Sequence, residues 1–152
     1  FEHKALYRSL SADIPDDYYT TEVGKAVITQ AGGDVSIITY GMGVHWAVEI
    51  TKELGVSAEI IDLRTLLPWD KDAVRASIEK TNKALVLHED CLTGGIGAEI
   101  SAWISEHCFQ DLDAPVYRVG SLDTPVPFAP TLEENFLPKA RLAEKIKLLM
   151  EF

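Results

Sequence analysis

The sequence predicts an α/β domain: a three-layer αβα sandwich around a mostly parallel five-stranded sheet with one antiparallel strand. Short runs rich in isoleucine, valine and leucine alternate with amphipathic segments along most of the chain, which is typical of a parallel sheet covered by helices. The first two runs are separated only by Gly32-Gly33-Asp34, a connection too short for a crossover helix. At 152 residues the chain is long enough to bury one substantial core.

The first half of the domain is expected to open with a hairpin. Residues 24–30 and 35–40 form its two antiparallel strands, and the glycine turn joins them. Gly43 then opens a helix that ends at Gly55. Its spacing predicts a buried face made of Val44, Ala47, Val48, Thr51 and Leu54.

The middle of the chain continues the alternation. Residues 57–63 form an isoleucine-rich strand, and Pro68-Trp69-Asp70 starts the next helix, with Asp70 as its N-cap. This helix is expected to bury Val74 and Ile78. Residues 84–89 are the most apolar strand, which predicts a central position in the sheet.

The last third contains two more helices and one more strand. The helix after the glycines is expected to bury Ile96, Ile100, Trp103 and Ile104, and residues 116–120 form the last strand. Three prolines in residues 123–130 predict an extended surface loop. Thr131 and Glu134 have capping-box spacing for a short helical turn. Pro138 starts the terminal helix, which turns Leu142, Ile146 and Leu149 inward.

Composition limits the partners of the chain. Its net charge of −10 argues against nucleic acid and against an anionic membrane, because both require a basic surface. No apolar run reaches the ~18 residues that span a bilayer. Cys91 and Cys108 lack metal-ligand spacing, so reduced thiols in a cytosolic or organelle-matrix protein are expected.

The first residues differ in character from the rest. Residues 1–22 are broken by proline, aspartates and tyrosines, which predicts a connecting arm that lies along a neighbour, and residues 23–152 form the domain. Because the chain opens with Phe1 rather than Met, we expect a fragment of a larger protein or a processed product.

Two segments have the pattern of a strand-to-helix site. Residues 40–47 carry Gly41 and Gly43 near Asp62, which is close to a dinucleotide-binding fingerprint. Trp46 replaces the third glycine and should push the helix away from the sheet, and the preceding strand belongs to the expected hairpin. A tight structural turn is therefore favoured over cofactor binding.

The second segment is residues 88–100, a strand end followed by glycines and a helix. Thr93, Gly94 and Gly95 could present amides to an anion, and His88 and Glu89 could act as an acid/base pair. However, neighbours on a strand point to opposite faces, so both cannot reach one substrate. A thiol–imidazole pair of Cys91 with His88 lacks a sequence signature. A buried polar corner that orders the turn is favoured.

Other polar residues predict structural roles. Asp62 and Arg64 are two apart at a strand end, where a same-side ion pair would fix the loop. His3, His45 and His107 have no carboxylate or cysteine at ligand spacing, which argues against a metal site. Residue chemistry alone thus predicts an αβα domain without a self-sufficient active site.

Several motifs occur in an order typical of one family. They are Phe1 to Arg8, Ile61 to Asp70, His88-Glu89 with Leu92 to Gly95, Leu112 to Pro115, and Asp123 to Pro125. Together they resemble the C-terminal domain of the β subunit of thiamine-diphosphate-dependent 2-oxo acid dehydrogenases, over essentially the whole chain. Residues 62–68 and 94–100 are similar to the wider transketolase-like group, while residues 67–70 and 88–95 favour the branched-chain (2-oxoisovalerate) type over the pyruvate type.

The resemblance implies a transketolase C-terminal-like fold and an assembly role. Thiamine diphosphate and Mg²⁺ would be bound by an upstream pyrimidine-binding domain and an α subunit or α region, so no cofactor is expected on this chain. The whole enzyme would decarboxylate a 2-oxo acid and transfer the acyl group to lipoyl. His88 and Glu89 would at most face that neighbouring site.

The resemblance also implies partners and a compartment. The domain would form a homodimer and hold a small basic module of the dihydrolipoyl acyltransferase core, with Asp113 and the terminal Phe152 as docking residues. The compartment would be the bacterial cytoplasm or the mitochondrial matrix. A pyruvate dehydrogenase or other transketolase-like β domain stays open as an alternative, as does a stand-alone nucleotide-binding module that uses Gly41 and Gly43.

Overall fold

The computed structural model describes residues 2–7 and 9–152. Phe1 and Arg8, the first and last residues of the opening motif of the resemblance, lie outside the described residues. A single five-stranded sheet has the order β1-β3-β2-β4-β5. Its strands are β1 (Val27–Gln30), β2 (Val35–Thr39), β3 (Ala58–Asp62), β4 (Ala84–Cys91) and β5 (Tyr117–Ser121). The helices are η1 (Lys4–Leu6), α1 (Met42–Leu54), α2 (Lys71–Thr81), α3 (Ile96–His107), η2 (Phe109–Asp111), α4 (Pro130–Phe136) and α5 (Lys139–Leu149).

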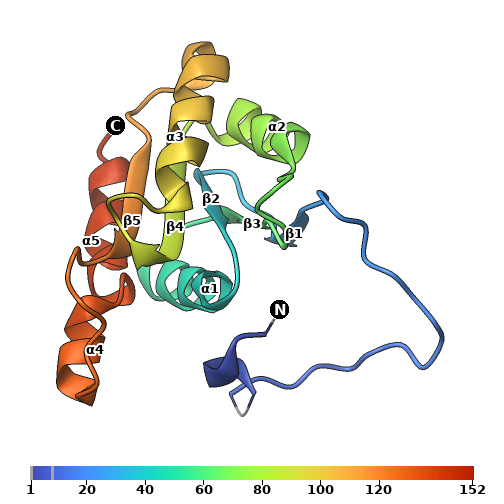
Figure 1. Cartoon of the computed structure of the whole chain (residues 1–152). Helices are drawn as coiled ribbons and strands as arrows, with labels where there is room; N and C mark the ends of the chain where they lie inside the picture. The colour runs from blue at the N-terminus through green and yellow to red at the C-terminus, as the bar shows by residue number, and fades with distance from the viewer. Residues whose placement is uncertain (1, 8) are drawn as a thin grey trace.

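Helices cover both faces of the sheet, which confirms the predicted αβα sandwich (Figure 1). One apolar cluster joins α1 and α5 to one face through residues such as Ala47, Leu87 and Ile146. The other cluster joins α2 and α3 to the opposite face through Ile78, Val86 and Ile104. The sheet is therefore buried on both sides, as its continuous apolar strands require.

The predicted hairpin is wrong in its partner, although one strand is antiparallel as expected. β1 pairs with β3 and forms the edge of the sheet, while β2 lies on the far side of β3. The reason lies in the glycine turn. The amides of Gly33 and Asp34 both donate to the carbonyl of Ser57, each at 2.8 Å, so the turn is held against the start of β3. Gly32 also packs directly on the backbone of Ala58, where a Cβ would overlap the carbonyl.

The middle strand of the sheet is β2 rather than β4. All five residues of β2 are buried, and it pairs in parallel with both β3 and β4. β4 lies next to it, and its apolar residues 84–87 are equally buried. A continuous apolar run thus indicates a strand that is buried on both faces. Because β2 and β4 are both buried in this way, the run alone does not tell which of them is the middle strand.

The buried face of α1 is wider than predicted and partly different. Val48 is 37% exposed, whereas Trp46 and Ile50 are buried. Trp46 does not push α1 away from the sheet, because it belongs to the core cluster that also contains residues of α5. α1 packs against α5 as well as against the strands, so a second side of the helix is covered.

Most helix ends follow the sequence. The carboxylate of Asp70 caps α2 by accepting the amide hydrogen of Ala73 at 3.1 Å, as predicted. α3 buries Ile100 and Ile104 as predicted, but Ile96 and Trp103 only partly. α4 begins at Pro130 without a side-chain cap from Thr131, so the capping box is wrong. In α5, Leu142, Ile146 and Leu149 are buried as predicted.

The arm and the loop before α4 lie on the outside. Residues 9–22 are exposed throughout, and Figure 1 shows them as a wide excursion that brings η1 back near α1. Residues 122–129 form the expected surface loop, with Phe128 fully exposed. Among the described residues, no helix combines the length and the apolar character that crossing a bilayer would require.

Candidate functional site

The carboxyl edge of the sheet, where β2, β3 and β4 end, gathers most of the candidate residues. The chain leaves β2 toward α1 on one face and leaves β4 toward α3 on the other. Such a divergence is the point at which open α/β sheets usually bind ligands. A cleft of about 780 Å³ lies here. It is lined by Glu2, His3, Tyr40, Gly41, Asp62, Arg64, Thr65, Leu66 and Leu67.

Two groups in this cleft have shifted proton affinities. Burial raises the pKa of the Tyr40 hydroxyl, and the nearby carboxylates of Asp90 and Glu89 raise it further. Burial also raises the pKa of Asp62, against the opposing effects of the Arg64 amide and the charges of Arg64 and His45. Tyr40 is therefore a neutral hydrogen-bond donor at physiological pH.

The expected ion pair between Asp62 and Arg64 is replaced by backbone contacts. The Arg64 amide donates to Oδ1 of Asp62 at 3.0 Å. The guanidinium donates through Nε and Nη2 to the carbonyl of Lys25, at 3.0 and 2.7 Å. Arg64 thus ties the residues before β1 to the end of β3, which is a structural role as expected.

His88 lies on the α3 face of β4 and is completely buried. It is enclosed by three glycines, Gly95, Gly97 and Gly120, which we call the glycine cradle. A Cβ at Gly95 would lie 2.7 Å from Cε1 of His88 and one at Gly120 would lie 2.9 Å from the same atom, while one at Gly97 would overlap Nε2 and Cδ2. These glycines therefore make room for the imidazole.

The imidazole of His88 is polar but unpaired. Within residues 2–7 and 9–152, neither Nδ1 nor Nε2 has a hydrogen-bond partner. Burial lowers the pKa of His88, the charge of Asp90 opposes this shift, and the charge of Arg118 adds to it. The ring is thus neutral at physiological pH and shielded from any substrate at the edge.

Glu89 points to the other face of β4, as strand alternation predicts. Its Oε2 accepts a hydrogen bond from Nε2 of His3 at 2.7 Å. The thiol of Cys91 donates to the carbonyl of Leu122 at 3.3 Å, so the pair of Cys91 with His88 is not formed in the described chain. The structure does not bring His88, Glu89 and Cys91 together as a catalytic group.

The turn at Thr93 binds an anionic group, which is the side-chain carboxylate of Asp123 in the same chain. The amide and hydroxyl of Thr93 donate to the carboxylate of Asp123, at 2.9 and 2.7 Å. These two bonds, the hydroxyl first, lower the pKa of Asp123. Asp123 was part of a family motif, yet nothing in its spacing along the sequence indicated that it would reach this turn.

The glycines of the possible nucleotide fingerprint have structural roles. Gly41 has φ +57°, a backbone conformation that side chains rarely adopt. Gly43 packs against Thr39, whose Oγ1 a Cβ would overlap. They make the tight turn from β2 into α1, in agreement with the favoured interpretation.

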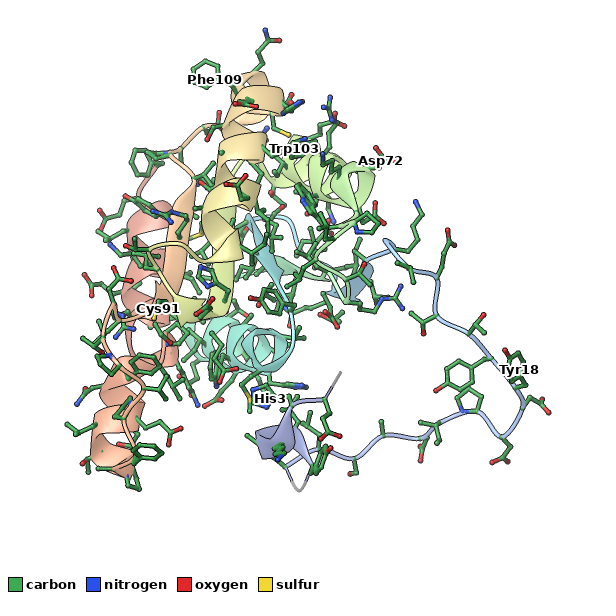
Figure 2. All side chains as sticks on the ribbon, viewed as in Figure 1. His3, Tyr18, Asp72, Cys91, Trp103 and Phe109 are labelled. Atoms are coloured by element: carbon green, nitrogen blue, oxygen red, sulfur yellow. The ribbon has the colours of Figure 1, made fainter. Side chains whose placement is uncertain are left out.

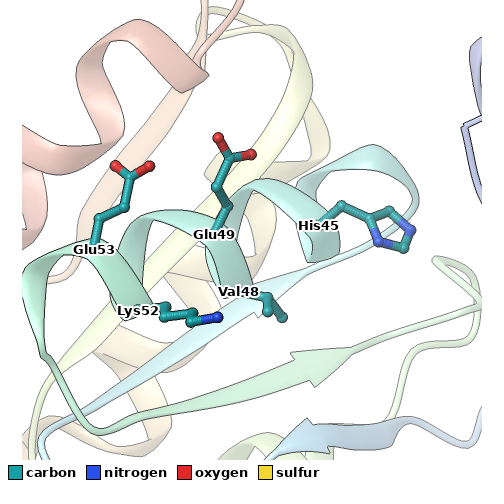
Figure 3. A pocket seen from close by; sticks show the side chains of 5 residues that line it. All are labelled: His45, Val48, Glu49, Lys52 and Glu53. Carbon is teal, nitrogen blue, oxygen red and sulfur yellow. The ribbon is translucent and has the colours of Figure 1, made fainter.

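A second hollow lies on the solvent side of α1, with a volume of about 620 Å³. Figure 3 shows Glu49 and Glu53 on one side of the helix and His45 projecting from its first turn. Lys139 donates to Glu49 at 2.7 Å, so one of the two carboxylates is already paired. His3 and His45 lie near the carboxyl edge and His107 ends α3, and no group of three possible metal ligands occurs among the residues described.

The two docking candidates lie at the opposite, amino edge. Asp113 is exposed beside a groove of about 520 Å³, lined also by Ser105, Phe109, Leu112, Ala114, Pro115 and Val116. Phe152 is 59% exposed, and Figure 1 shows the C-terminus at the same end of the molecule as the segment between α3 and β5. Figure 2 shows Phe109 and His3 at opposite ends of the molecule.

Comparison with known proteins gives one consistent family. Residues 24–142 match the family described as "Transketolase, C-terminal domain". The chain is 44% identical over 141 residues to a Bacillus subtilis 2-oxoisovalerate dehydrogenase subunit beta, covering 90% of this chain and 43% of that protein. It is also 44% identical over 156 residues to a Staphylococcus aureus pyruvate dehydrogenase E1 component subunit beta, covering 99% of this chain and 47% of that protein.

A solved structure agrees with these sequence matches. It is described as a split gene transketolase, an inactive beta4 tetramer, and is 25% identical with a TM-score of 0.74. The alignment covers 93% of this chain and 46% of the transketolase chain. The chain thus spans about half the length of the curated relatives that it matches.

Proposed function

The chain belongs to the transketolase C-terminal domain family, and on that premise we propose that it is the C-terminal domain of a 2-oxo acid dehydrogenase β subunit. The observation that carries the proposal is 44% identity to two such subunits over 90% or more of the chain. We infer that the domain assembles the enzyme and that decarboxylation and acyl transfer to lipoyl take place on its neighbours.

The carboxyl edge supports a non-catalytic role. His88 is enclosed by the glycine cradle, and Glu89 accepts a hydrogen bond from His3. The donors of the Thr93 turn are already bonded to the carboxylate of Asp123. A diphosphate requires free amides or cations. This edge instead presents carboxylates at Asp62, Glu89 and Asp90. The residues therefore do not fit the diphosphate of thiamine diphosphate, and we assign the cofactor and its Mg²⁺ to an upstream pyrimidine-binding domain and an α subunit.

Calorimetry tests this assignment. Titration of thiamine diphosphate with Mg²⁺ into the 152-residue chain should give no micromolar binding. A thermal-shift screen with NAD, ATP and flavin tests the nucleotide-binding alternative, because a ligand that binds the native state raises the unfolding temperature. Stabilisation by a nucleotide would favour that alternative, whereas micromolar binding of thiamine diphosphate would overturn the assembly role.

For the substrate, we propose the branched-chain type, 2-oxoisovalerate. Residues 67–70 and 88–95 carry the motifs that favour this type. The pyruvate-type relative is just as similar, at 44% identity, and is the second candidate. Comparing turnover of 2-oxoisovalerate and pyruvate by the assembled enzyme decides between them, because a higher kcat/KM for pyruvate would reverse the assignment.

For assembly, we propose that the amino edge docks a basic module of the dihydrolipoyl acyltransferase core and that the domain forms a homodimer. Asp113 supplies a negative charge beside a groove that also carries exposed Phe109, and Phe152 is exposed at the end of the chain. An aromatic side chain next to a charge is a common feature of interface hot spots. A protein with this function would reside in the bacterial cytoplasm or the mitochondrial matrix.

Binding measurements test the docking residues. Asp113→Ala and deletion of Phe152 should each weaken acyltransferase binding about tenfold, which corresponds to roughly 1.4 kcal/mol. Glu53→Ala removes an exposed carboxylate on α1 and serves as a matched control that should leave the affinity unchanged. If Asp113→Ala and the deletion of Phe152 bind the acyltransferase as tightly as the wild type and Glu53→Ala do, the docking site lies elsewhere. Analytical ultracentrifugation of the same proteins measures their mass in solution. A dimer mass is expected, and a monomer mass would contradict the proposed homodimer.

A further inference from the structure

The opening segment of the chain returns to the domain at one defined contact. His3 and Glu89 are 86 residues apart, and their side chains meet at 2.7 Å between Nε2 and Oε2. The side chains are only 33% and 38% exposed, so the bond is partly shielded from water. A hydrogen bond to a carboxylate is roughly twice as strong as one between neutral groups.

The rest of the arm contributes little to holding this segment. Residues 9–22 are all exposed, and Tyr18 lies far from the body of the domain (Figure 2). In the parts of residues 2–22 that the structure describes, the His3–Glu89 bond is the one hydrogen bond to the remainder of the chain. The remaining bonds of η1 are local, such as Leu6 to His3 at 3.0 Å.

The contact also builds part of a cleft. Glu2 and His3 line the 780 Å³ cleft at the carboxyl edge together with Tyr40, Asp62 and residues 64–67. These other lining residues belong to the domain body, at the ends of β2 and β3. Without the opening segment, the cleft would lack the wall that Glu2 and His3 supply.

We propose that His3 and Glu89 form a latch that holds residues 2–7 against the carboxyl edge and completes this cleft. The latch does not depend on the proposed function, because it rests on contacts within this chain. His3 must carry its proton on Nε2 to donate to Glu89. The geometry makes Glu89 a positioning residue for the arm rather than an acid or base.

Proteolysis of the full 152-residue chain tests the latch. The measured quantity is the rate of tryptic cleavage after Lys4, which lies in η1 and must leave the helical turn to be cut. His3→Ala and Glu89→Ala should each increase this rate roughly five- to tenfold, since each removes the same bond. The double variant should cleave no faster than the faster single variant, because two residues that act through one bond are not additive.

Two controls separate release of the latch from damage to the fold. His107→Ala removes an exposed histidine at the end of α3 and should leave the cleavage rate unchanged. The amide NMR signals of Tyr40 and Leu66 report the cleft directly and should shift in His3→Ala but not in His107→Ala. Unchanged cleavage in both single variants, or rates that multiply in the double variant, would overturn the proposal.

Discussion

The two edges of the sheet differ in how completely their buried polar groups are paired. At the amino edge they are paired. The hydroxyl of Ser36 bonds to Ser77 and Thr81, at 2.5 and 2.7 Å. The buried carboxylate of Glu59 accepts from the ammonium of Lys80 at 2.5 Å. Such satisfied contacts are what a stable interior requires.

At the carboxyl edge, fully buried polar atoms remain unpaired. Within the described chain these include both ring nitrogens of His88 and Oγ1 of Thr39. Each unpaired buried group costs about 1–3 kcal/mol relative to a paired one. The comparison shows that pairing of buried polar groups stabilises the amino edge. At the carboxyl edge, His88 and Thr39 lower the stability of the fold, which is typical of residues that are kept for a reason other than stability.

The largest expected effect comes from filling the glycine cradle. Gly97→Ala should reduce the free energy of unfolding by about 2 kcal/mol, because its Cβ would overlap the ring of a fully buried His88. Urea unfolding measures the change. Combining it with His88→Ala should cost less than the sum of the two single changes, since the smaller side chain leaves room.

Gly33→Ala is the matched control for that substitution. No atom of the described chain lies within 4 Å of a Cβ at Gly33, so this change should alter the free energy by less than about 0.5 kcal/mol. An equal loss at Gly33 and Gly97 would mean that the contact with His88 does not determine the cost, because the lower entropy of the unfolded alanine chain favours folding at both positions.

A smaller effect is expected at the amino edge from Asn82. This residue ends α2 with φ +57°, and its side chain donates to the carbonyl of Asp111 at 2.8 Å. Asn82→Ala should cost about 1.5 kcal/mol in urea unfolding, from backbone strain and the lost hydrogen bond. Asn82→Gly keeps the backbone conformation and should cost less. If the glycine variant is the less stable of the two, strain is not the cause.

The smallest effect is a pH dependence that comes from His88 at the carboxyl edge. Burial lowers the pKa of His88 below the ordinary 6.5, so the unfolded chain binds this proton more readily than the folded chain. The contribution of His88 is complete above about pH 6.5 and is lost as the pH falls toward the lowered pKa.

Comparison with a non-titrating variant isolates this contribution. Between about pH 7 and about pH 5, the wild type should lose more stability than His88→Asn, because only the histidine can bind the proton. Chemical unfolding at each pH measures both proteins. Parallel curves for the two would show that His88 titrates alike in the folded and unfolded chain.

The sequence was sufficient for the layers and most elements of the fold, because periodicity and glycine turns reflect local physics. It predicted the three layers, the cap of α2 by Asp70 and the inward face of α5. The prediction was wrong where a residue distant in the sequence determines which strands pair. β1 pairs with β3 because Ser57 binds the turn after β1, and no local pattern contains that information.

The same limit applies to the candidate site. Alternation along β4 correctly separated His88 from Glu89. Their partners could not be predicted, because His3, Gly120 and Asp123 reach this edge from other parts of the chain. The docking residues Asp113 and Phe152 stay predictions, although both proved to be exposed at one end of the sheet.

The glycine cradle has a consequence for how related sequences can diverge. Gly95 precedes α3 as its N-cap, Gly97 lies in the first turn of α3 and Gly120 comes from β5, yet all three lie close to one side chain on β4. A larger residue at Gly97 is compatible with the fold only when position 88 becomes smaller, whereas Gly95 and Gly120 also lie close to the backbone carbonyls of Cys91 and Asp90. Positions 88 and 97 should therefore be inherited together, and a homologue that lacks the histidine is where alanine or serine should first replace Gly97.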